Sequence, residues 1–261
     1  MGRESLAEIE FLVRSTCRVR ILEALTECGS LTSAELRREI GVVRTTVQRN
    51  LDALEERGLV HSVADGYEIT IAGELVATGI GEMTETVAFI ERAKAVLSQL
   101  TEADVPLDVD PQALVDATVV EATAANPYAP VESHLKTLTT TARTRAVLPA
   151  TSADALETAR SAAESGATAE IVLADEVVET VQSTPTLREH FESLADLENV
   201  TIYQYDGEVP YYLGILDDAV QIGVHDEAGI PQALLESTDD DVREWATERY
   251  EAYRRDAEPL A

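Results

Sequence analysis

The sequence predicts a multi-domain α/β protein in which a small helical domain with a hairpin is joined by a long helix to a larger domain. Residues 31–71 carry the signals of two helices separated by a turn and followed by a hairpin. Helical spacing then continues without a break to about residue 100, and strand and helix signals alternate beyond it. At this length, two domains can each bury a core. We expect the parts to span residues 1–73, 74–104 and 105–261.

A tight turn between two helices is the most specific local signal. Thr32 precedes an apolar helical pattern and Glu35 follows three residues later, which is the capping-box spacing at a helix start. Gly41 interrupts that pattern. A second helix is expected over residues 44–57 and ends before Gly58, because glycine commonly follows the last helical residue. These signals predict a helix-turn-helix.

The second of these helices has one apolar side and one polar side. Val47, Leu51 and Leu54 recur at helical spacing and must face inward. The polar side-chain types around them form hydrogen bonds with phosphates and base edges in protein–DNA complexes. We expect the following residues to contact DNA: Arg44, Thr45, Thr46, Gln48, Arg49 and Asn50.

A hairpin is expected directly after this helix pair. Residues 59–63 and 67–71 alternate in polarity on either side of Asp65-Gly66, a pair that favours hairpin turns. Helices and hairpin in this order predict a winged helix-turn-helix, which lays its second helix in the major groove. The hairpin has no lysine or arginine, so we expect at most a backbone hydrogen bond from it to DNA.

Apolar residues at helical spacing before residue 31 predict two further helices. Arg14, Arg18 and Arg20 cluster where these helices join. Contact with the phosphate backbone, exposure to solvent and ion pairing with Glu10 and Glu23 are all open for these arginines.

The charge of the chain is unevenly distributed. A net charge of −29 should repel a polyanion, but residues 1–80 hold nine arginines against thirteen acidic residues, whereas residues 81–261 hold eleven basic and thirty-six acidic residues. Only two lysines occur, Lys94 and Lys136. This composition resembles that of proteins from extreme halophiles. In their concentrated cytoplasmic salt, counterion release contributes little to DNA binding, so affinity would depend on base contacts, shape and dimer geometry. An acidic surface that serves solubility alone is the alternative.

The chain shows no membrane-spanning or secretory pattern. No apolar run approaches the length that spans a bilayer, and no signal peptide precedes Phe11. Cys17 and Cys28 are eleven residues apart on one expected helix, too far to form a disulfide with each other. We therefore expect a cytoplasmic protein with two reduced cysteines that serve as small core residues, with an intermolecular redox role as the alternative.

The long helical run carries an apolar seam. Its positions step alternately by four and three residues, which is the coiled-coil spacing. We expect a homodimer, since twofold symmetry matches a palindromic operator; an amphipathic helix that covers its own domain is the alternative. The seam consists of Val76, Ile80, Met83, Val87, Ile90, Lys94 and Leu97.

After a proline- and aspartate-rich linker at residues 101–111, strand and helix signals alternate. They predict a mixed sheet with a largely parallel first half and an antiparallel hairpin end. Strands are expected at residues 117–121, 145–148, 169–173, 200–205, 212–216, 219–224 and 233–235. Helices are expected at residues 131–142, 152–165, 175–181, 187–194 and 239–256.

Several segments together resemble one family across nearly the whole chain. They are Ile9-Glu10-Phe11-Leu12, Asn126-Pro127-Tyr128-Ala129-Pro130 with Val131 and Leu135, Tyr205-Asp206-Gly207 with Pro210, Gly214-Ile215-Leu216-Asp217-Asp218, and Trp245-Ala246 with Tyr250, Tyr253, Arg254 and Arg255. The chain resembles the haloarchaeal and methanogen transcriptional regulators that join a winged helix to a methanogenesis-regulator (filament-regulator) middle domain. The resemblance implies a DNA-binding regulator whose second domain senses a ligand or holds the dimer. It does not identify an effector.

An enzymatic second domain is the principal alternative. Its strand order resembles half of a phospholipase-D-like fold, and His134-Leu135-Lys136 is similar to that family's His-x-Lys motif. However, Thr141 stands where the motif needs aspartate, and the pair falls in a helical pattern rather than at a strand end. The four histidines lack ligand spacing, and no phosphate-binding loop or nucleophile elbow occurs, so we expect no enzyme, metal or cofactor. A scaffold that uses the helix-turn-helix to bind another protein is a further alternative.

A small-molecule effector would bind in the crevice at the strand ends of the second domain. Aromatic faces with a few polar tips, and an arginine for an anionic group, suit such a pocket; they suit a dimer interface or an ordinary core equally well. The candidate residues are Asn126, Tyr128, Arg145, Tyr205, Asp206 and Tyr212. The expected partners are thus double-stranded DNA, a second copy of the chain and, if the second domain senses a ligand, this effector, without a membrane.

Overall fold

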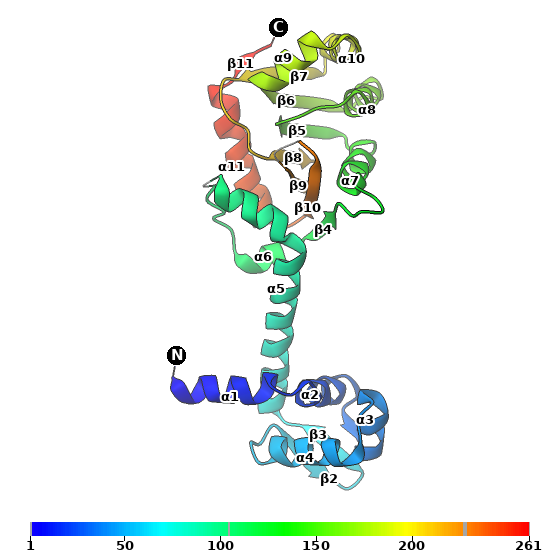
Figure 1. Cartoon of the computed structure of the whole chain (residues 1–261), viewed down its shortest axis with the longest axis vertical. Helices are drawn as coiled ribbons and strands as arrows, with labels where there is room; N and C mark the ends of the chain where they lie inside the picture. Colours follow the sequence, from blue (N-terminus) through cyan, green and yellow to red (C-terminus); the bar gives the residue numbers. More distant parts are fainter. Residues whose placement is uncertain (1, 104, 227–228, 261) are drawn as a thin grey trace. The chain divides into compact units, whose positions relative to one another are not determined.

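The computed structural model describes residues 2–103, 105–226 and 229–260. Its contacts divide the chain into two compact units that meet at Val87 and Ala88, within the long helix α5 (Ile71–Glu102) (Figure 1). The helix is therefore not a unit of its own, because each unit includes one part of it. No helix in the described ranges is long and apolar enough to cross a membrane.

The amino-terminal unit begins with four helices: α1 (Arg3–Val13), α2 (Thr16–Cys28), α3 (Ser33–Ile40) and α4 (Arg44–Glu55). The predicted capping box is present, because Thr32 and Glu35 satisfy each other's backbone N–H groups. Gly41 ends α3 in the left-handed conformation, with φ of 76°, which glycine adopts without strain. The core of this unit lies among the four helices and includes Ile21, Leu25, Leu36, Val47 and Leu51, all nearly inaccessible.

A three-stranded antiparallel sheet completes this unit. Strands β2 (Val60–Val63) and β3 (Gly66–Ile69) form the predicted hairpin. A third strand, β1 (Ser30–Leu31), pairs with β3 and was not predicted, because two residues carry no periodicity. A Cβ at Gly66 would overlap the carbonyl group of Leu31, so the close approach of these strands requires glycine there.

Helix α5 contributes to both cores. Val76 and Ile80 pack on the core of the first unit, and Phe89 and Val96 are buried in that of the second. No residue in the range 81–88 belongs to either core. On the predicted seam, Met83, Val87 and Ile90 are about half exposed.

The second unit is built on one eight-stranded mixed sheet with the order β11-β7-β6-β5-β8-β9-β10-β4. As predicted, β5, β6 and β7 are parallel and β8, β9 and β10 are antiparallel. The first strand, β4, pairs with β10 at the antiparallel edge. The strands are β4 (Thr118–Glu121), β5 (Arg143–Leu148), β6 (Thr168–Ala174), β7 (Val200–Tyr205), β8 (Tyr212–Leu216), β9 (Ala219–His225), β10 (Pro231–Ser237) and β11 (Glu258–Pro259).

Helices cover both faces of this sheet. Figure 1 shows α7 (Ala129–Leu138), α8 (Ala153–Glu164) and α10 (Pro185–Ala195) along one face and α11 (Asp240–Asp256) along the other. Helix α9 (Asp175–Ser183) follows β6 and packs on α10, and α6 (Pro111–Val115) packs on α11. Helix α6 and strand β11 were not predicted. The multi-domain α/β class with a mixed sheet is confirmed.

Candidate nucleic-acid interface and ligand pocket

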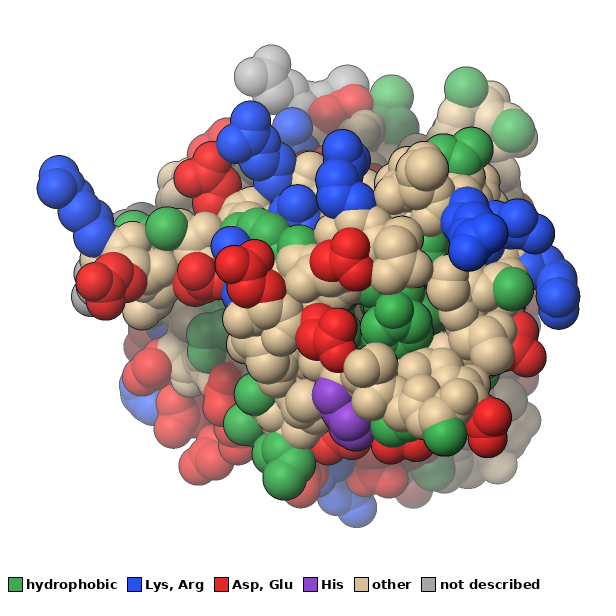
Figure 2. All heavy atoms as spheres, turned by 90° about the horizontal axis from the view of Figure 1, so that it is seen from below, with side chains coloured by type: hydrophobic (Ala, Val, Ile, Leu, Met, Phe, Trp, Pro, Cys, Tyr) green, Lys and Arg blue, Asp and Glu red, His purple; other side chains and the backbone are tan. Residues whose placement is uncertain are grey.

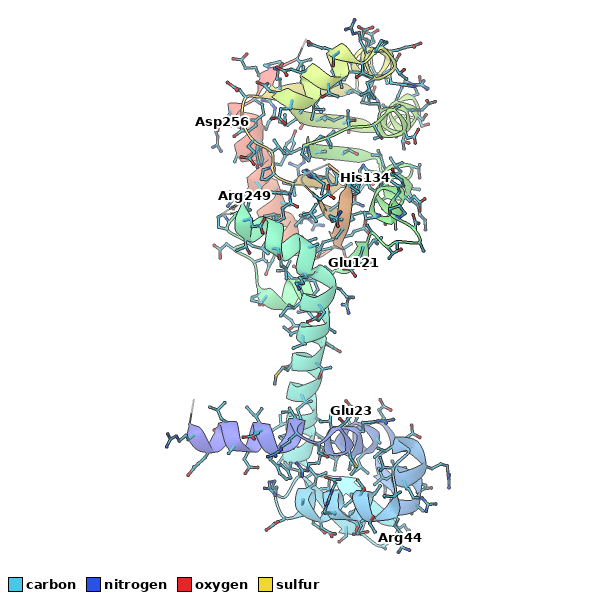
Figure 3. The ribbon with its side chains drawn as sticks, viewed as in Figure 1. Glu23, Arg44, Glu121, His134, Arg249 and Asp256 are labelled. Atoms are coloured by element: carbon cyan, nitrogen blue, oxygen red, sulfur yellow. The ribbon has the colours of Figure 1, made fainter. Side chains whose placement is uncertain are left out.

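The polar side of α4 is accessible, as predicted. Arg44, Thr45 and Arg49 are exposed, and Thr46 and Gln48 are half-buried. Figure 3 shows the Arg44 side chain on the outside of its unit. The apolar side faces inward, where Val47, Leu51 and Leu54 have no accessible surface. The amphipathic pattern therefore sets the orientation of α4 about its own axis.

The structure corrects the prediction for Asn50. Its side chain is only 2% exposed, its Nδ2 donates to the Thr46 carbonyl at 2.8 Å, and its Oδ1 accepts from Ser15 Oγ at 3.4 Å. Asn50 therefore joins α4 to the start of α2 and is not available to DNA. The contact with Ser15 crosses thirty-five residues of sequence, so no local pattern indicates it.

Gln48 is held in place by two neighbours. Its Nε2 donates to Asp52 Oδ1 at 2.8 Å, one helical turn later, and to the Tyr67 hydroxyl at 3.1 Å. Tyr67 lies on β3, so this contact links the polar side of α4 to the hairpin. The amide oxygen of Gln48 remains as an acceptor, which suits the amino groups of bases.

Three arginines gather beside α4. The guanidinium groups of Arg18 and Arg57 both stack on the Phe11 ring, at 3.7 and 3.5 Å from its centroid. Burial lowers the pKa of Arg18, and repulsion from Arg57 and Arg49 lowers it further. Glu8 pairs with Arg57 at 3.0 Å. A phosphate group placed here would relieve the repulsion, so this arginine cluster, Arg18, Arg49 and Arg57, suits a DNA backbone.

The other two arginines at the helix junction have partners in the protein. Arg20 donates to the Ile40 carbonyl at 3.0 Å and so helps to cap the end of α3. Arg14 forms an exposed ion pair with Glu10 at 3.7 Å. The predicted ion pair with Glu10 is therefore confirmed for Arg14, whereas Arg20 contacts backbone carbonyls at the end of α3.

The face that carries α4 and the hairpin is mixed in charge. Figure 2 shows lysine or arginine side chains gathered toward one side of this face, with acidic side chains across its centre and its other side. On the hairpin, His61 faces Glu68 at 3.7 Å. Positive charge is thus available on one side, and the hairpin adds none.

The six predicted effector residues are not brought together. Arg145 lies on the α11 side of the sheet, where it pairs with Glu251 at 3.6 Å. Tyr205 packs on Tyr253 with ring centroids 5.1 Å apart, and Asp206 follows it in an exposed loop. The side-chain amide of Asn126 donates a hydrogen bond to Glu132 in the first turn of α7. The shared-pocket prediction is therefore wrong for these four residues.

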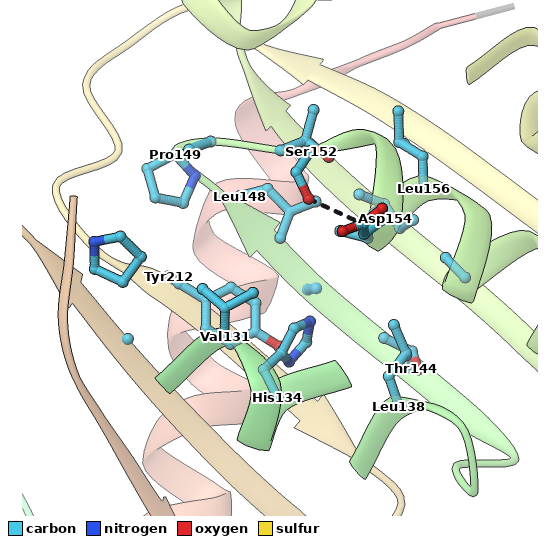
Figure 4. Close-up of a pocket in the computed structure, with 18 of the residues that line it drawn as sticks. Val131, His134, Leu138, Thr144, Leu148, Pro149, Ser152, Asp154, Leu156 and Tyr212 are labelled. Carbon is cyan, nitrogen blue, oxygen red and sulfur yellow. Dashed lines mark hydrogen bonds between the residues drawn. The ribbon is translucent and has the colours of Figure 1, made fainter. Parts of the chain in front are cut away.

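Tyr128 and Tyr212 do line a common cavity, on the sheet face covered by α7 and α8 (Figure 4). Its volume is about 440 Å³. Alanines from α8, the neighbouring strands and the loops on either side of α8 form much of its wall: Ala146, Ala150, Ala155, Ala159, Ala162, Ala163, Ala167, Ala169 and Ala233. These short side chains leave the space between α8 and the sheet unfilled, so the cavity follows from the alanine-rich sequence of α8.

One polar chain ends in the wall of this cavity. His134 Nδ1 lies 2.8 Å from Gln221 Oε1, and Gln221 Nε2 donates to Glu236 Oε2 at 2.6 Å. The hydroxyl of Tyr212 lies 3.3 Å from the same Nδ1. Burial lowers the pKa of His134 and raises that of Tyr212, so both groups are neutral near pH 7. His134 lies on α7, as the helical pattern around it predicted.

Neither a metal site nor a disulfide is found in the part of the chain that the structure describes. No group of three or more His, Cys, Asp or Glu side chains there is arranged to hold a metal ion. Cys17 and Cys28 are both free; Cys17 is buried and Cys28 is exposed. The expectation of a small core residue is therefore confirmed for Cys17 and wrong for Cys28.

The fold and the exposed polar helix define a winged-helix protein with an α/β second domain. Two known domain families match this chain. Residues 6–105 match the HVO_A0261 N-terminal domain, and residues 127–256 match the middle domain of the methanogenesis regulatory protein FilR1. Together the two matches cover most of the chain, and they support a transcriptional regulator of the type that its sequence resemblance predicted.

A curated relative is the HTH-type transcriptional regulator Rv1719 of Mycobacterium tuberculosis, 32% identical over 117 residues. That match covers 42% of this chain and 43% of the relative. Among solved structures, the archaeal chromatin protein TrmBL2 is 17% identical with a TM-score of 0.41 over 99% of this chain and 100% of that one. Nuc, a phospholipase D family member from Salmonella typhimurium, is 13% identical with a TM-score of 0.44 over 56% of this chain and 99% of its own. These structural likenesses are too remote to assign a function.

Proposed function

We propose that this regulator binds double-stranded DNA by placing the polar side of α4 in the major groove. The observation that carries the proposal is the exposure of Arg44, Thr45 and Arg49 beside a Gln48 amide held in a fixed position. These are the side-chain types that read base edges. The arginine cluster would hold the adjacent phosphates. The two family matches support the same reading.

The regulator would act as a homodimer joined through α5. Met83, Val87 and Ile90 lie one helical turn apart with their side chains about half exposed, whereas Val76, Ile80, Phe89 and Val96 of the same helix pack in the two cores. A second copy would cover this seam. Dimerisation also places two α4 helices on successive half-sites of a palindromic operator.

The second domain would hold a small-molecule effector. Support comes from the cavity beneath α7 and α8, which lies in the size range of about 300–1,000 Å³ typical of ligand sites. The acidic composition supports a halophilic archaeal host, in which the relevant binding medium is concentrated potassium salt.

The direct test selects DNA from randomised duplexes with the full chain in potassium chloride and then measures affinity for the selected operator. We expect Arg49→Ala to lose about 1–3 kcal/mol of binding free energy if Arg49 contacts a guanine. Arg188→Ala, an exposed arginine on α10, is the matched control and should bind as the wild type does. Failure to enrich any duplex, together with equal affinities of both variants for genomic DNA, would refute the proposal. Chromatin immunoprecipitation from the host would then separate a regulator from a protein-binding scaffold.

A further inference from the structure

The cavity beneath α7 and α8 is mainly apolar, with polar side chains at several points of its wall: His134, Thr144, Thr151, Ser152, Asp154, Thr168, Tyr212 and His225. Leu138, Leu148, Leu156 and Ile171 line it together with the alanines named above. Among the described residues in its wall there is no lysine or arginine, and Asp154 lies at its edge. An anionic ligand would therefore enter without a countercharge, in a domain that is itself strongly acidic.

Two of these polar groups, His134 and Tyr212, form a pair, which Figure 4 shows side by side in the cavity wall. Because Gln221 donates its amide N–H to Glu236, its oxygen faces His134 and must accept from Nδ1. The proton of the neutral imidazole is thus on Nδ1. Nε2 keeps its lone pair and receives no hydrogen bond from the residues that the structure describes.

Tyr212 is positioned by two glycines. A Cβ at Gly214 would overlap its hydroxyl, and a Cβ at Gly223 would lie 3.1 Å from its ring. The ring therefore lies against the sheet where any other residue would push it away. With Nδ1–H of His134 directed at the phenol oxygen and at Gln221, the phenol hydrogen is free to donate into the cavity. One donor, on Tyr212, and one acceptor, Nε2 of His134, thus stand next to each other.

We propose that this cavity binds a neutral, mainly apolar molecule that carries one hydroxyl group. The hydroxyl would donate to His134 Nε2 and accept from the Tyr212 hydroxyl, while the hydrocarbon part fills the space left by the α8 alanines. This inference deepens the proposed function. Calling the bound molecule an effector rests on the proposed function. Binding itself does not require DNA.

The test uses the fluorescence of N-phenyl-1-naphthylamine, a neutral aromatic probe with one N–H donor, titrated with the full chain in potassium chloride. We expect the emission to rise on binding and to fall again when 1-octanol displaces the probe. Octanoate, which has the same chain length but carries a negative charge, should displace it poorly. No rise in emission, or equal displacement by 1-octanol and octanoate, would overturn the proposal.

Variants then locate the site. Ala159→Leu fills the cavity and should weaken probe binding at least about tenfold, whereas Ala153→Leu, on the same helix but outside the cavity wall, should not. Ala155→Leu replaces Ala159→Leu if circular dichroism shows that the latter is unfolded. Equal binding by the filled and control variants would overturn the location.

Tyr212→Phe keeps the ring and removes the donor, so its affinity for 1-octanol should fall about fivefold, the value of one neutral hydrogen bond. Unchanged affinity would overturn the role of the polar pair. A chain that binds the probe but no DNA would contradict the proposed function alone. A chain that binds DNA but no probe would contradict this inference alone.

Discussion

The side-chain amide of Gln48 on α4 donates a hydrogen bond to the hydroxyl of Tyr67 on β3, with 3.1 Å between the nitrogen and oxygen atoms. Asp52 accepts a second bond from the same nitrogen at 2.8 Å. The hairpin therefore orients a side chain of the proposed recognition helix although it brings no positive charge of its own. A side chain ordered before binding loses less conformational entropy when DNA arrives.

Tyr67→Phe should therefore weaken operator binding about fivefold, because it removes one neutral hydrogen bond that orients Gln48. Fluorescence anisotropy with the selected operator measures the change. Tyr128→Phe, at an exposed tyrosine in the second domain, serves as the control and should bind as the wild type does. Equal affinities of the two variants would show that the hairpin does not contribute through Gln48.

Arg57→Gln should weaken binding to operator and to unrelated duplexes alike, because the arginine cluster is expected to contact phosphates rather than bases. The slope of the logarithm of the affinity against the logarithm of the potassium chloride concentration should fall by about one. Arg188→Gln is the control. A loss confined to the operator, or an unchanged slope, would place Arg57 outside the phosphate contacts.

The same substitution at two glycines should change the free energy of unfolding in opposite directions. Gly41→Ala forces a Cβ into a left-handed conformation with φ of 76° and should cost about 1–2 kcal/mol. Gly79→Ala lies inside α5, where an added Cβ meets nothing within 4 Å, and should gain up to about 1 kcal/mol. Thermal unfolding of both variants gives the result; a stabilised Gly41→Ala would refute the role of that turn.

Val87→Glu should shift the chain from dimer to monomer, because it places a charge in the exposed apolar seam of α5. We expect the dimer dissociation constant to rise at least about tenfold, as measured by sedimentation equilibrium. Ala88→Glu adds the same charge at an exposed neighbouring position off the seam and should leave the constant unchanged. Dimers that persist equally in both variants would remove α5 from the interface.

Stability should fall as the pH drops below about 6.5, in part because of His134. Burial lowers the pKa of His134 below its ordinary value of 6.5, so the unfolded chain binds this proton more tightly than the folded one. The stabilisation is fully present above pH 6.5 and is lost as the pH falls toward the folded pKa. In His134→Phe, the melting temperature should depend less on pH between pH 7.5 and 5.5, and Tyr212→Phe should keep the wild-type dependence. An equal dependence in His134→Phe would exclude this cause.

The parts of the fold that the sequence predicted are those with local causes. The capping box of Thr32 and Glu35, the left-handed Gly41 and the hairpin around Asp65-Gly66 each depend on residues a few positions apart. The same holds for most helices and strands of the second domain, whose periodicities place them within a few residues of the observed bounds, although helix α6 was not predicted. Strands β1 and β11 have two residues each, too few for a period, and only pairing with distant strands defines them.

The sites were harder to predict because they depend on tertiary contacts. The side chain of Asn50 is of a type that binds DNA bases, but it is buried and accepts a hydrogen bond from Ser15. Arg145 was assigned to the effector pocket from its place on a strand, yet alternate residues of a strand face opposite sides, and it points toward α11. The cavity arises where alanines on α8 lie opposite the sheet. The order of the strands in the sheet determines where these alanines lie relative to Gly214 and Gly223, and no local pattern indicates that order.

The stretch at residues 81–88 of α5 has one further consequence. No core packs against it and Gly81 lowers its intrinsic helical preference, so neither core of the chain supports this stretch. Its order would then be coupled to burial of Met83 and Val87 by a second copy. Protein concentration would therefore control more than the number of subunits, because it would also set the stability of this part of α5.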